Sequence, residues 1–168
     1  MKRIGLLSDT HGHIPKQAST FFAECNEIWH AGDIGNLEAA IELAGIKPLK
    51  AVYGNIDGQE LRSFYPLYQD FSCEGVKVLM IHIGGYPGKY TPEAKRLIEE
   101  IQPKLFITGH SHILKVMNDP KYNLLHINPG AAGKYGWHTV STLIRFTIEG
   151  EEIKDLEIQE IPKHEQLI

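Results

Sequence analysis

Five short polar clusters in this sequence contain side chains that metal-dependent enzymes use as ligands. Each cluster directly follows an apolar run rich in strand-favouring residues. Because the carboxyl ends of strands in an open α/β sheet are where such folds build their sites, we expect the clusters to meet. Carboxylate, amide and imidazole ligands without a thiolate suit Mn, Fe, Zn, Co or Ni, and they do not suit a closed structural zinc site. The candidate ligands of this predicted binuclear centre are Asp9, His11, Asp33, Asn55, His82, His110 and His112.

The spacing inside the clusters indicates how ions would be shared. Asp9 and His11 are alternate residues just past a predicted strand, so both side chains would face one side and reach one ion. His110 and His112 alternate in the same way and could bind neighbouring ions. Asp33 follows a glycine turn and is suitably placed to bridge two cations.

The elements that must position these residues begin with alternating strands and helices. The apolar patterns predict strands over 4–7, 27–31 and 49–53. Between them, one helix begins near Pro15 and extends to Cys25, and a second covers 37–44 and is stopped by Gly45. This order implies right-handed crossovers and a parallel sheet.

The second half is richer in strands. A hairpin is predicted around Glu74-Gly75, and a helix begins at Thr91-Pro92 and extends to about residue 101. The predicted strands are 67–72, 76–82, 104–108, 114–117, 124–127, 139–147 and 153–158. We therefore predict a single α/β domain over residues 1–162, a four-layer α/β/β/α sandwich of two mixed sheets with flanking helices. The tail over 163–168 is expected to fray.

As an ordered set, the motifs D-x-H, G-D, G-N-x-D, H and G-H-x-H resemble those of the calcineurin-like metallophosphoesterase superfamily. More narrowly, they resemble its small YfcE-like phosphodiesterase branch. Asn128-Pro129-Gly130 resembles the N-P-G motif that follows the last ligand loop in that branch. The resemblance spans residues 9–133 and implies the metallophosphoesterase fold, which is the same four-layer sandwich.

The resemblance also implies an activity, the hydrolysis of small phosphodiesters by a hydroxide that bridges two divalent ions. Mn²⁺ is the first expectation, with Zn²⁺, Fe²⁺, Ni²⁺, Co²⁺ or Mg²⁺ as alternatives. Asp33 would bridge, and it would act with Asn55 and His82 as a catalytic residue. One ion would be held by Asp9, His11, Asp33 and His112, and the other by Asp33, Asn55, His82 and His110.

Two positions depart from this pattern. Much of the superfamily has a histidine after the asparagine that helps to protonate the leaving group, but this chain has Ile56. We therefore expect aryl phosphodiesters to react much faster than alkyl ones. Ile83 follows His82, where the branch more often has glycine. The glycine-rich segment 84–90 comes next, and we expect it to line the substrate cleft with Lys89 near the phosphate.

Other polar residues have competing interpretations. His13 and His138 are candidates for substrate contact, although a histidine in a loop more often has no such role. Asp57 is expected to hydrogen-bond within the loop that carries Asn55. His30 and His126 lie inside strand patterns and are expected to be packed.

Composition limits the classes of partner. The net charge is −4, from 17 basic and 21 acidic residues, and the absence of a basic block argues against long nucleic acids. No apolar run approaches the length of a membrane span, and no leader pattern is visible, so we expect no membrane contact and a cytoplasmic location. A small phosphodiester or phosphomonoester is the expected substrate, and a homodimer is compatible with one compact domain. The alternatives are a non-catalytic interaction module, like the retromer subunit of this fold, and a nucleotide phosphatase or pyrophosphatase.

Overall fold

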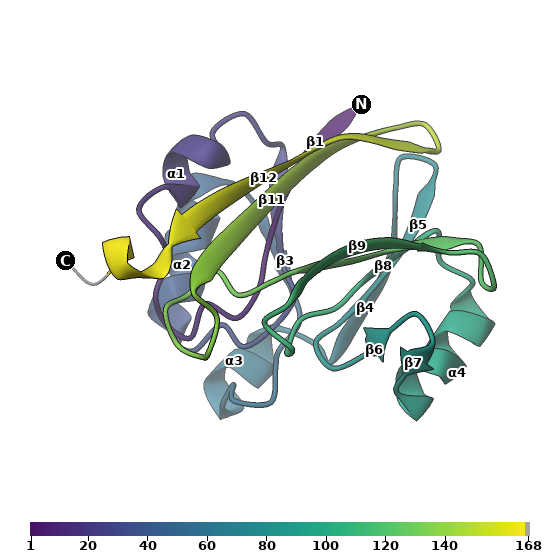
Figure 1. The fold of residues 1–168 in the computed structure, drawn as a ribbon, viewed down its shortest axis with the longest axis horizontal. Coiled ribbons are helices and arrows are strands. Elements are labelled where there is room, and N and C mark those ends of the chain that lie inside the picture. Colours follow the sequence, from purple (N-terminus) through teal and green to yellow (C-terminus); the bar gives the residue numbers. More distant parts are fainter. Residues whose placement is uncertain (167–168) are drawn as a thin grey trace.

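Two five-stranded sheets packed face to face form the centre of the molecule (Figure 1). This computed structural model describes residues 1–166. The first sheet has the order β12-β11-β1-β2-β3, and β1, β2 and β3 are parallel, as the sequence predicted. Its strands are β1 (Lys2–Leu7), β2 (Glu27–His30), β3 (Leu49–Ala51), β11 (Val140–Glu149) and β12 (Glu152–Pro162).

The second sheet has the order β4-β5-β8-β10-β9, and β5, β8 and β10 are parallel. Its first two strands form the predicted hairpin around Glu74-Gly75, with Glu74 in the left-handed region at φ 51°. The strands are β4 (Tyr68–Cys73), β5 (Val76–Ile81), β8 (Leu105–Ile107), β9 (Leu114–Asp119) and β10 (Leu124–Pro129).

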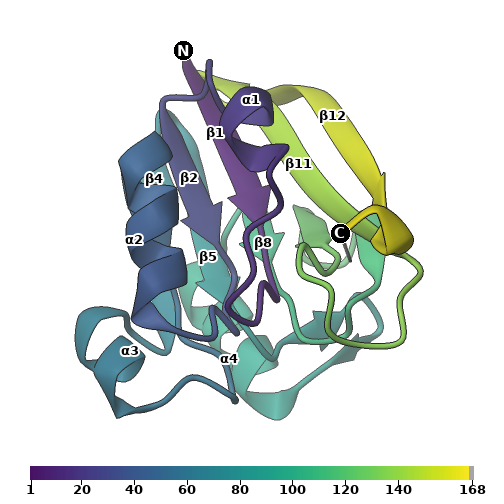
Figure 2. The same cartoon turned by 90° about the vertical axis from the view of Figure 1, so that its left-hand side faces the viewer.

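Helices cover the outer face of each sheet. In Figure 1, α1 (Ala18–Phe21) and α2 (Leu37–Ile46) lie outside the first sheet on the left, and α4 (Pro92–Ile101) lies outside the second sheet on the lower right. Figure 2 views the first sheet with α1 and α2 on the near side. Three hydrophobic clusters fill the three interfaces, and Leu6 and Leu7 of β1 belong to different clusters because alternate side chains point to opposite faces. This arrangement confirms the predicted α/β/β/α sandwich.

Several local predictions were wrong. Helix α1 ends at Phe21, well before Cys25, because tight turns replace the helix after Phe22. Helix α2 continues through Gly45, since Ile46 still packs against the core and Pro48 is what prevents continuation. A further helix, α3 (Gln59–Phe64), was not predicted. The segment expected to be a loop over 84–90 forms a two-stranded hairpin of β6 (Gly85–Tyr86) and β7 (Lys89–Tyr90).

The segment after Pro162, where fraying was expected, forms a 3-10 helix over Lys163–Gln166. Gln166 is buried, and its amide bonds to His13 and Ser141. The final two positions of the expected tail lie outside the described residues.

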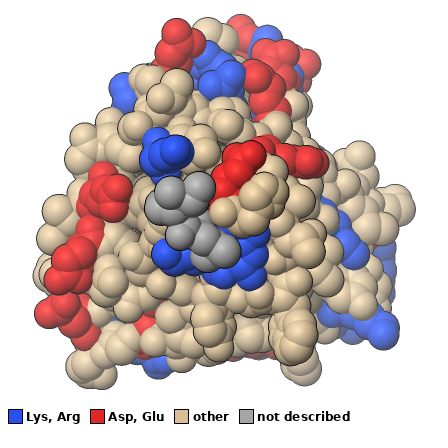
Figure 3. Space-filling model, turned by 60° about the vertical axis from the view of Figure 1, so that its left-hand side comes forward, with Lys and Arg blue, Asp and Glu red and all other residues tan. Residues whose placement is uncertain are grey.

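The surface carries charges of both signs. On the face seen in Figure 3, acidic and basic side chains are both spread over the molecule, with several basic groups near the C-terminal end of the described chain. Among residues 1–166, no helix is long and apolar enough to cross a membrane.

Candidate metal centre

The seven candidate ligands lie in loops at the carboxyl ends of five strands. Strands β1, β2 and β3 are parallel to one another, and β5 is parallel to β8, so within each sheet these loops emerge at one edge. His82 directly follows β5, and His110 and His112 lie in the loop between β8 and β9. The topology therefore brings together residues more than 100 positions apart, since the backbone N–H of His110 donates to Asp9 Oδ2 at 3.1 Å.

The first group of ligands contains Asp9, His11 and His112, whose ligand atoms all lie within 4.8 Å of one another. His112 Nε2 is 3.2 Å from Asp9 Oδ1, and His11 Nε2 is 4.0 Å from the same oxygen. Asp9 is fully buried, and both histidines are partly buried. An ion at this position would have one carboxylate and two imidazoles around it.

The second group contains Asp33, His82 and His110, again within 4.8 Å of one another. His82 Nε2 is 3.2 Å from Asp33 Oδ2, which in turn lies 3.5 Å from His11 Nε2 of the first group. Asn55 Oδ1 is 3.1 Å from His110 Nδ1 and so lies beside this group. Asp33 stands between the two groups, where a bridging ligand would be needed.

The hydrogen bonding of each carboxylate leaves one oxygen facing the ligand cluster. Asp9 Oδ2 accepts from Ser8 Oγ at 2.7 Å and from the His110 backbone, whereas Asp9 Oδ1 is buried with no hydrogen-bond partner among the described residues. Asp33 Oδ1 accepts from the Ile56 backbone at 3.0 Å, and Asp33 Oδ2 faces the histidines. Each carboxylate is thus oriented by one oxygen, and the other can bind a cation.

His82 likewise has one ring atom that is hydrogen-bonded and one that faces the cluster. His82 Nδ1 donates to Ala31 O at 2.7 Å, which fixes the ring and assigns its Nε2 to the cluster. Within residues 1–166, His82 Nε2 and His11 Nε2 are buried and have no hydrogen-bond partner. Buried polar atoms are normally satisfied, so unsatisfied donors and acceptors that converge on one place fit a pair of cations.

Five of the seven candidate ligands have a left-handed backbone conformation. Asp9, His11 and Asp33 have φ of 53°, 47° and 57°, and His110 and His112 have φ of 71° and 63°. This conformation is uncommon for residues other than glycine, and it concentrates at functional sites. Asp9 and His11 do converge, but through these sharp turns and not through the strand-like alternation that we had assumed.

The electrostatics of the cluster favour ionised carboxylates. Burial would raise the pKa of Asp9, but the nearby His112 imidazole and the charge of His82 hold it below its usual value. Burial has the same effect on Asp33, and the close approach of the His82 imidazole again brings the pKa below its usual value. Burial would lower the pKa of His82, yet the nearby carboxylates of Asp33 and Asp9 raise it. Burial lowers the pKa of His11. A cation would displace protons from such a cluster on binding.

Asp57 holds two ligand loops together, as predicted for the loop after β3. Its carboxylate accepts from the backbone of Gly54 at 2.8 Å, Gly35 at 2.9 Å and Ile34 at 3.1 Å. Gly54 has no room for a side chain, because an added Cβ would overlap Asp33. Asp57 therefore fixes the loops of Asp33 and Asn55 relative to each other.

His30 and Asn128 hold further ligand loops. His30, packed as predicted, accepts from the Gly32 backbone with Nδ1 at 3.0 Å and bonds Thr10 Oγ1 with Nε2 at 2.9 Å. Asn128, in the N-P-G motif, donates to Gly109 O and to Ser111 Oγ, both at 3.0 Å. These side chains do not face the cluster directly, but they hold the residues that flank its ligands.

The structure does not bring all three predicted substrate residues to the cluster. Lys89 lines a hollow with Lys95, Asp119 and Lys121 that contains none of the seven candidate ligands. His13 is tied to Gln166 through its Nε2 at 2.9 Å.

His138 is the predicted substrate residue that lies beside the cluster. Its ring is 5.4 Å from that of His112 and nearly perpendicular to it, and its Nε2 bonds Gly133 O at 2.8 Å. Burial lowers the pKa of His138.

Two residues beside the cluster were missed by the sequence analysis. Arg62 of α3 donates from Nε to Asp57 O at 2.6 Å and from Nη2 to Asn55 O at 3.4 Å, and its guanidinium stacks on Tyr53 at 4.5 Å. Tyr135 stacks on His11, with ring centroids 4.8 Å apart and 27° between the ring planes, although it is 68% exposed. Neither residue belongs to a motif, so only the fold could place them.

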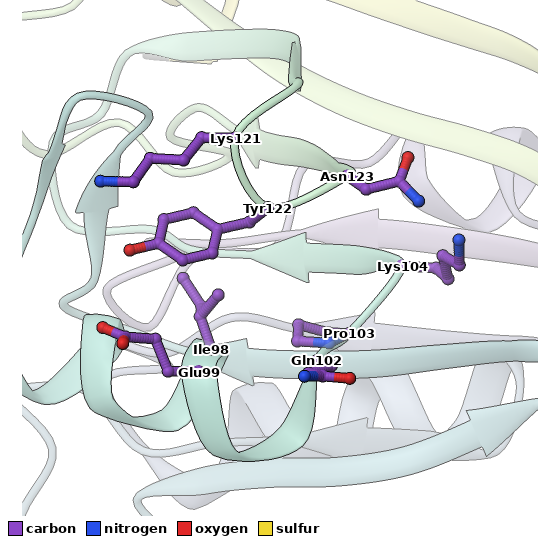
Figure 4. Close-up of a pocket in the computed structure, with 8 residues that line it drawn as sticks. All are labelled: Ile98, Glu99, Gln102, Pro103, Lys104, Lys121, Tyr122 and Asn123. Atoms are coloured by element: carbon purple, nitrogen blue, oxygen red, sulfur yellow. The ribbon is translucent and has the colours of Figure 1, made fainter.

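Cavities occur both beside the cluster and far from it. A cavity of about 530 Å³ is lined by residues that include Asn55, His82 and Arg62. Another, of about 470 Å³, lies between the end of α4 and the turn from β9 to β10, and is lined by Ile98, Tyr122 and others shown in Figure 4. The second cavity contains none of the candidate ligands.

Comparison with known proteins identifies a family and several similar proteins. The sequence profile of the calcineurin-like phosphoesterase superfamily domain matches residues 1–151. A probable metallophosphoesterase of Methanothermobacter thermautotrophicus is 30% identical over 135 residues, which is 76% of this chain and 76% of that protein.

Two similar structures are Vps29 proteins. Vps29 of Chaetomium thermophilum has a TM-score of 0.77 at 14% identity, covering 96% of this chain and 97% of that one. Vps29 of Entamoeba histolytica, in complex with Zn²⁺, has a TM-score of 0.74 at 16% identity, covering 96% and 99%. At these identities the likeness concerns the fold alone.

Proposed function

Because the chain belongs to the calcineurin-like phosphoesterase superfamily, we propose that it is a metal-dependent phosphodiesterase that hydrolyses small phosphodiesters. One observation carries the proposal: three buried polar atoms, two from the loop after β1 and one from the end of β5, converge without hydrogen-bond partners among residues 1–166. These atoms are Asp9 Oδ1, His11 Nε2 and His82 Nε2.

The residues of the cluster suit two cations. When bound, two such ions supply positive charge to the phosphoryl oxygens and lower the pKa of a water molecule. One ion would be held by Asp9, His11, Asp33 and His112, and the other by Asp33, Asn55, His82 and His110.

The chain's own residues would keep this site ordered during the reaction. Asp33 remains ionised and lies between both groups of ligands. The His82 ring is held by Ala31 O, so that its Nε2 faces the cluster throughout. Asp57 and Asn128 fix the loops and thereby keep the ligands within reach of one another.

Among residues 1–166, no side chain beside the cluster is a strong candidate to protonate the leaving group. His138 has Nε2 bonded to a carbonyl oxygen, and that bond requires the ring proton to be on Nε2 in the neutral form. Its lowered pKa disfavours a second proton on Nδ1. With Ile56 beside Asn55, the site therefore favours substrates whose leaving group needs no proton, such as aryl phosphodiesters.

The test is hydrolysis of bis(4-nitrophenyl) phosphate by protein loaded with Mn²⁺, together with the metal content of that protein. We expect about two ions per chain and hydrolysis that is abolished by a chelator. Asp33→Asn should lower the rate at least about 100-fold, because the bridging carboxylate is lost.

Asp155→Asn is a matched control, because Asp155 has nearly the same backbone φ as Asp33, 55° against 57°, but is exposed and outside the cluster. That variant should keep full activity. Equal activity in Asp33→Asn and Asp155→Asn would refute the proposal.

The same assay separates the enzyme from a non-catalytic interaction module. Metal uptake alone does not distinguish them, since a Vps29 of the same fold was also studied in complex with Zn²⁺. Hydrolysis that depends on Asp33 does distinguish an enzyme from an interaction module. The seven positions that retain side chains able to bind metal favour the enzyme.

A further inference from the structure

A cavity next to the cluster shares two residues with it. Asn55 and His82, both candidate ligands, belong to the lining of the cavity of about 530 Å³ between α3 and the start of α4. This volume is within the range of small-molecule sites and is sufficient for an aromatic ring. A phosphoryl group held at the cluster would therefore have an open space on the side of Asn55 and His82.

The walls of this cavity are mainly apolar. Leu67 and Ile83 line it and remain 38% and 41% exposed, although both are large hydrophobic residues. Tyr53, Ile81 and Pro92 complete the apolar lining. Ile83 is also one of the two departures from the expected family pattern, which places a bulky apolar side chain where glycine is commoner.

The cavity also contains a cationic group on the side of the cluster. Arg62 is fixed by the carbonyl oxygens of Asn55 and Asp57 and by its stacking on Tyr53. A guanidinium has five N–H donors, and these two bonds use two of them. Glu93 is the other charged residue in the lining. An apolar space with one fixed cation next to a metal cluster suits an apolar group attached to a phosphate.

We propose that this cavity binds an aromatic or apolar ester group of the substrate and so selects aryl phosphodiesters over small alkyl ones. The inference deepens the proposed function and rests on it for the position of the phosphoryl group. Leu67, Ile83 and Pro92 would form the contact surface, and Arg62 would face the negatively charged phosphate. Selection by this cavity adds to the leaving-group preference that follows from Ile56, and binding measurements separate the two.

The experiment compares phenylphosphonate with methylphosphonate as ligands of protein loaded with diamagnetic Zn²⁺. Neither compound has an ester bond to break, so the comparison reports binding and not leaving-group chemistry. We expect phenylphosphonate to bind at least about 10-fold more tightly. In methyl NMR spectra, the signals of Leu67 and Ile83 should shift with phenylphosphonate and stay in place with methylphosphonate.

Leu67→Asp should remove the preference for phenylphosphonate while leaving the affinity for methylphosphonate within about twofold. Ile41→Asp is the matched control, because Ile41 is 62% exposed on α2 and does not line the cavity. It should keep the preference. Thermal melts of both variants check folding, and the NMR titration of the unaltered protein needs no variant.

The outcomes separate the two proposals. Equal affinities for the two phosphonates, or an unchanged preference in Leu67→Asp, would overturn the cavity assignment even in an active phosphodiesterase. Discrimination that depends on Leu67 in a protein without hydrolytic activity would support the cavity and count against the proposed function alone.

Discussion

The two sheets anchor their ligand loops with opposite chemistry. On the side of the first sheet, the Asp57 carboxylate accepts three backbone N–H groups, from Ile34, Gly35 and Gly54. On the side of the second sheet, the Asn128 amide donates to Gly109 O and Ser111 Oγ. Its Oδ1 accepts from the backbone of Gly130 at 2.9 Å.

The difference follows from the polar groups that each set of turns presents to its anchoring side chain. The loops after β2 and β3 present only N–H groups to Asp57, and a carboxylate, which only accepts, satisfies them. The loop after β8 and the turn after β10 present a carbonyl, a hydroxyl and an N–H to Asn128, which requires a side chain that both donates and accepts. The choice between Asp and Asn at these positions is thus fixed by the turns and not by the metal.

A second pair of buried residues, one in each sheet, differs in how many hydrogen bonds its members make. His30 and His126 each bond the hydroxyl of a threonine, Thr10 and Thr108, at 2.9 Å. His30 also accepts from the Gly32 backbone, whereas His126 Nδ1 has no hydrogen-bond partner among the described residues. His30 therefore holds a ligand loop, and His126 mainly fills space.

Replacing the Asn128 amide on the second sheet by a carboxylate should cause the largest loss of stability. Asn128→Asp places a carboxylate, with no N–H to donate, against Gly109 O in a position that is only 4% exposed. We expect a loss of about 3 to 5 kcal/mol in the free energy of unfolding, measured by urea denaturation at pH 7. A loss below about 1 kcal/mol would contradict the role assigned to the amide.

Replacing the Asp57 carboxylate on the first sheet by an amide should cause a somewhat smaller loss of stability. Asp57→Asn keeps one accepting oxygen but turns an N–H₂ group toward backbone N–H donors. We expect a loss of about 2 to 4 kcal/mol in the same assay and weaker metal binding. Asp70→Asn, at an exposed position on β4, is the control and should lie within about 0.5 kcal/mol of the unaltered protein.

The buried histidines should make stability depend on pH. Burial lowers the pKa of His30 and of His126 to about 4, from 6.5. Between these values the unfolded chain binds protons that the folded chain does not, so the free energy of unfolding falls as pH is lowered. Each histidine should contribute a loss of about 2 kcal/mol between pH 7 and pH 5.

Denaturation of His126→Phe at both pH values checks this pH dependence. The variant should lose less stability over the interval than the unaltered protein, because one of the two titrating groups is gone. An identical pH dependence in the two proteins would show that His126 is protonated without unfolding.

The smallest predicted effect is the difference in the free energy of unfolding between His30→Phe and His126→Phe at pH 7. His30→Phe leaves the buried N–H of Gly32 without its acceptor, whereas in His126→Phe the hydroxyl of Thr108 can still donate to Gly85 O. His30→Phe should therefore be less stable than His126→Phe by about 1 to 2 kcal/mol. Equal stabilities would remove the contrast between the two residues.

The fold was largely predictable because its signals are local. Apolar runs, the Glu74-Gly75 turn and the Thr91-Pro92 start of α4 each predict one element, and their order leaves few topologies. Helix α3 was missed because it has only six residues, one buried residue, and a glycine at its N-cap with no side chain to signal it. Gly45 predicts the end of α2, but packing of Ile46 outweighs a cost of about 1 kcal/mol for glycine in a helix.

The candidate site was predictable in its residue types but not in its geometry. The convergence of the seven candidate ligands follows from strand order, whereas the left-handed backbone at Asp9 and His11 has no sequence signal. Lys89 lies away from the cluster because β6 and β7 form a hairpin, which the glycine-rich pattern did not specify. A lone arginine such as Arg62 carries no motif, so its place beside Asn55 depends on the fold.

The left-handed turns at five ligand positions bear on how this scaffold can evolve. Glycine at position 11 or 112 would relieve about 1 kcal/mol of conformational penalty and remove a candidate ligand at the same time. Glycine at position 9 or 33 would also remove the carboxylates that accept from Ser8, His110 and Ile56. If the proposed metal binding were no longer selected, the backbone conformation alone would therefore favour replacement of His11 and His112 by glycine. Asn55 and His82 are not among the positive-φ residues, so glycine at either position would bring no such relief.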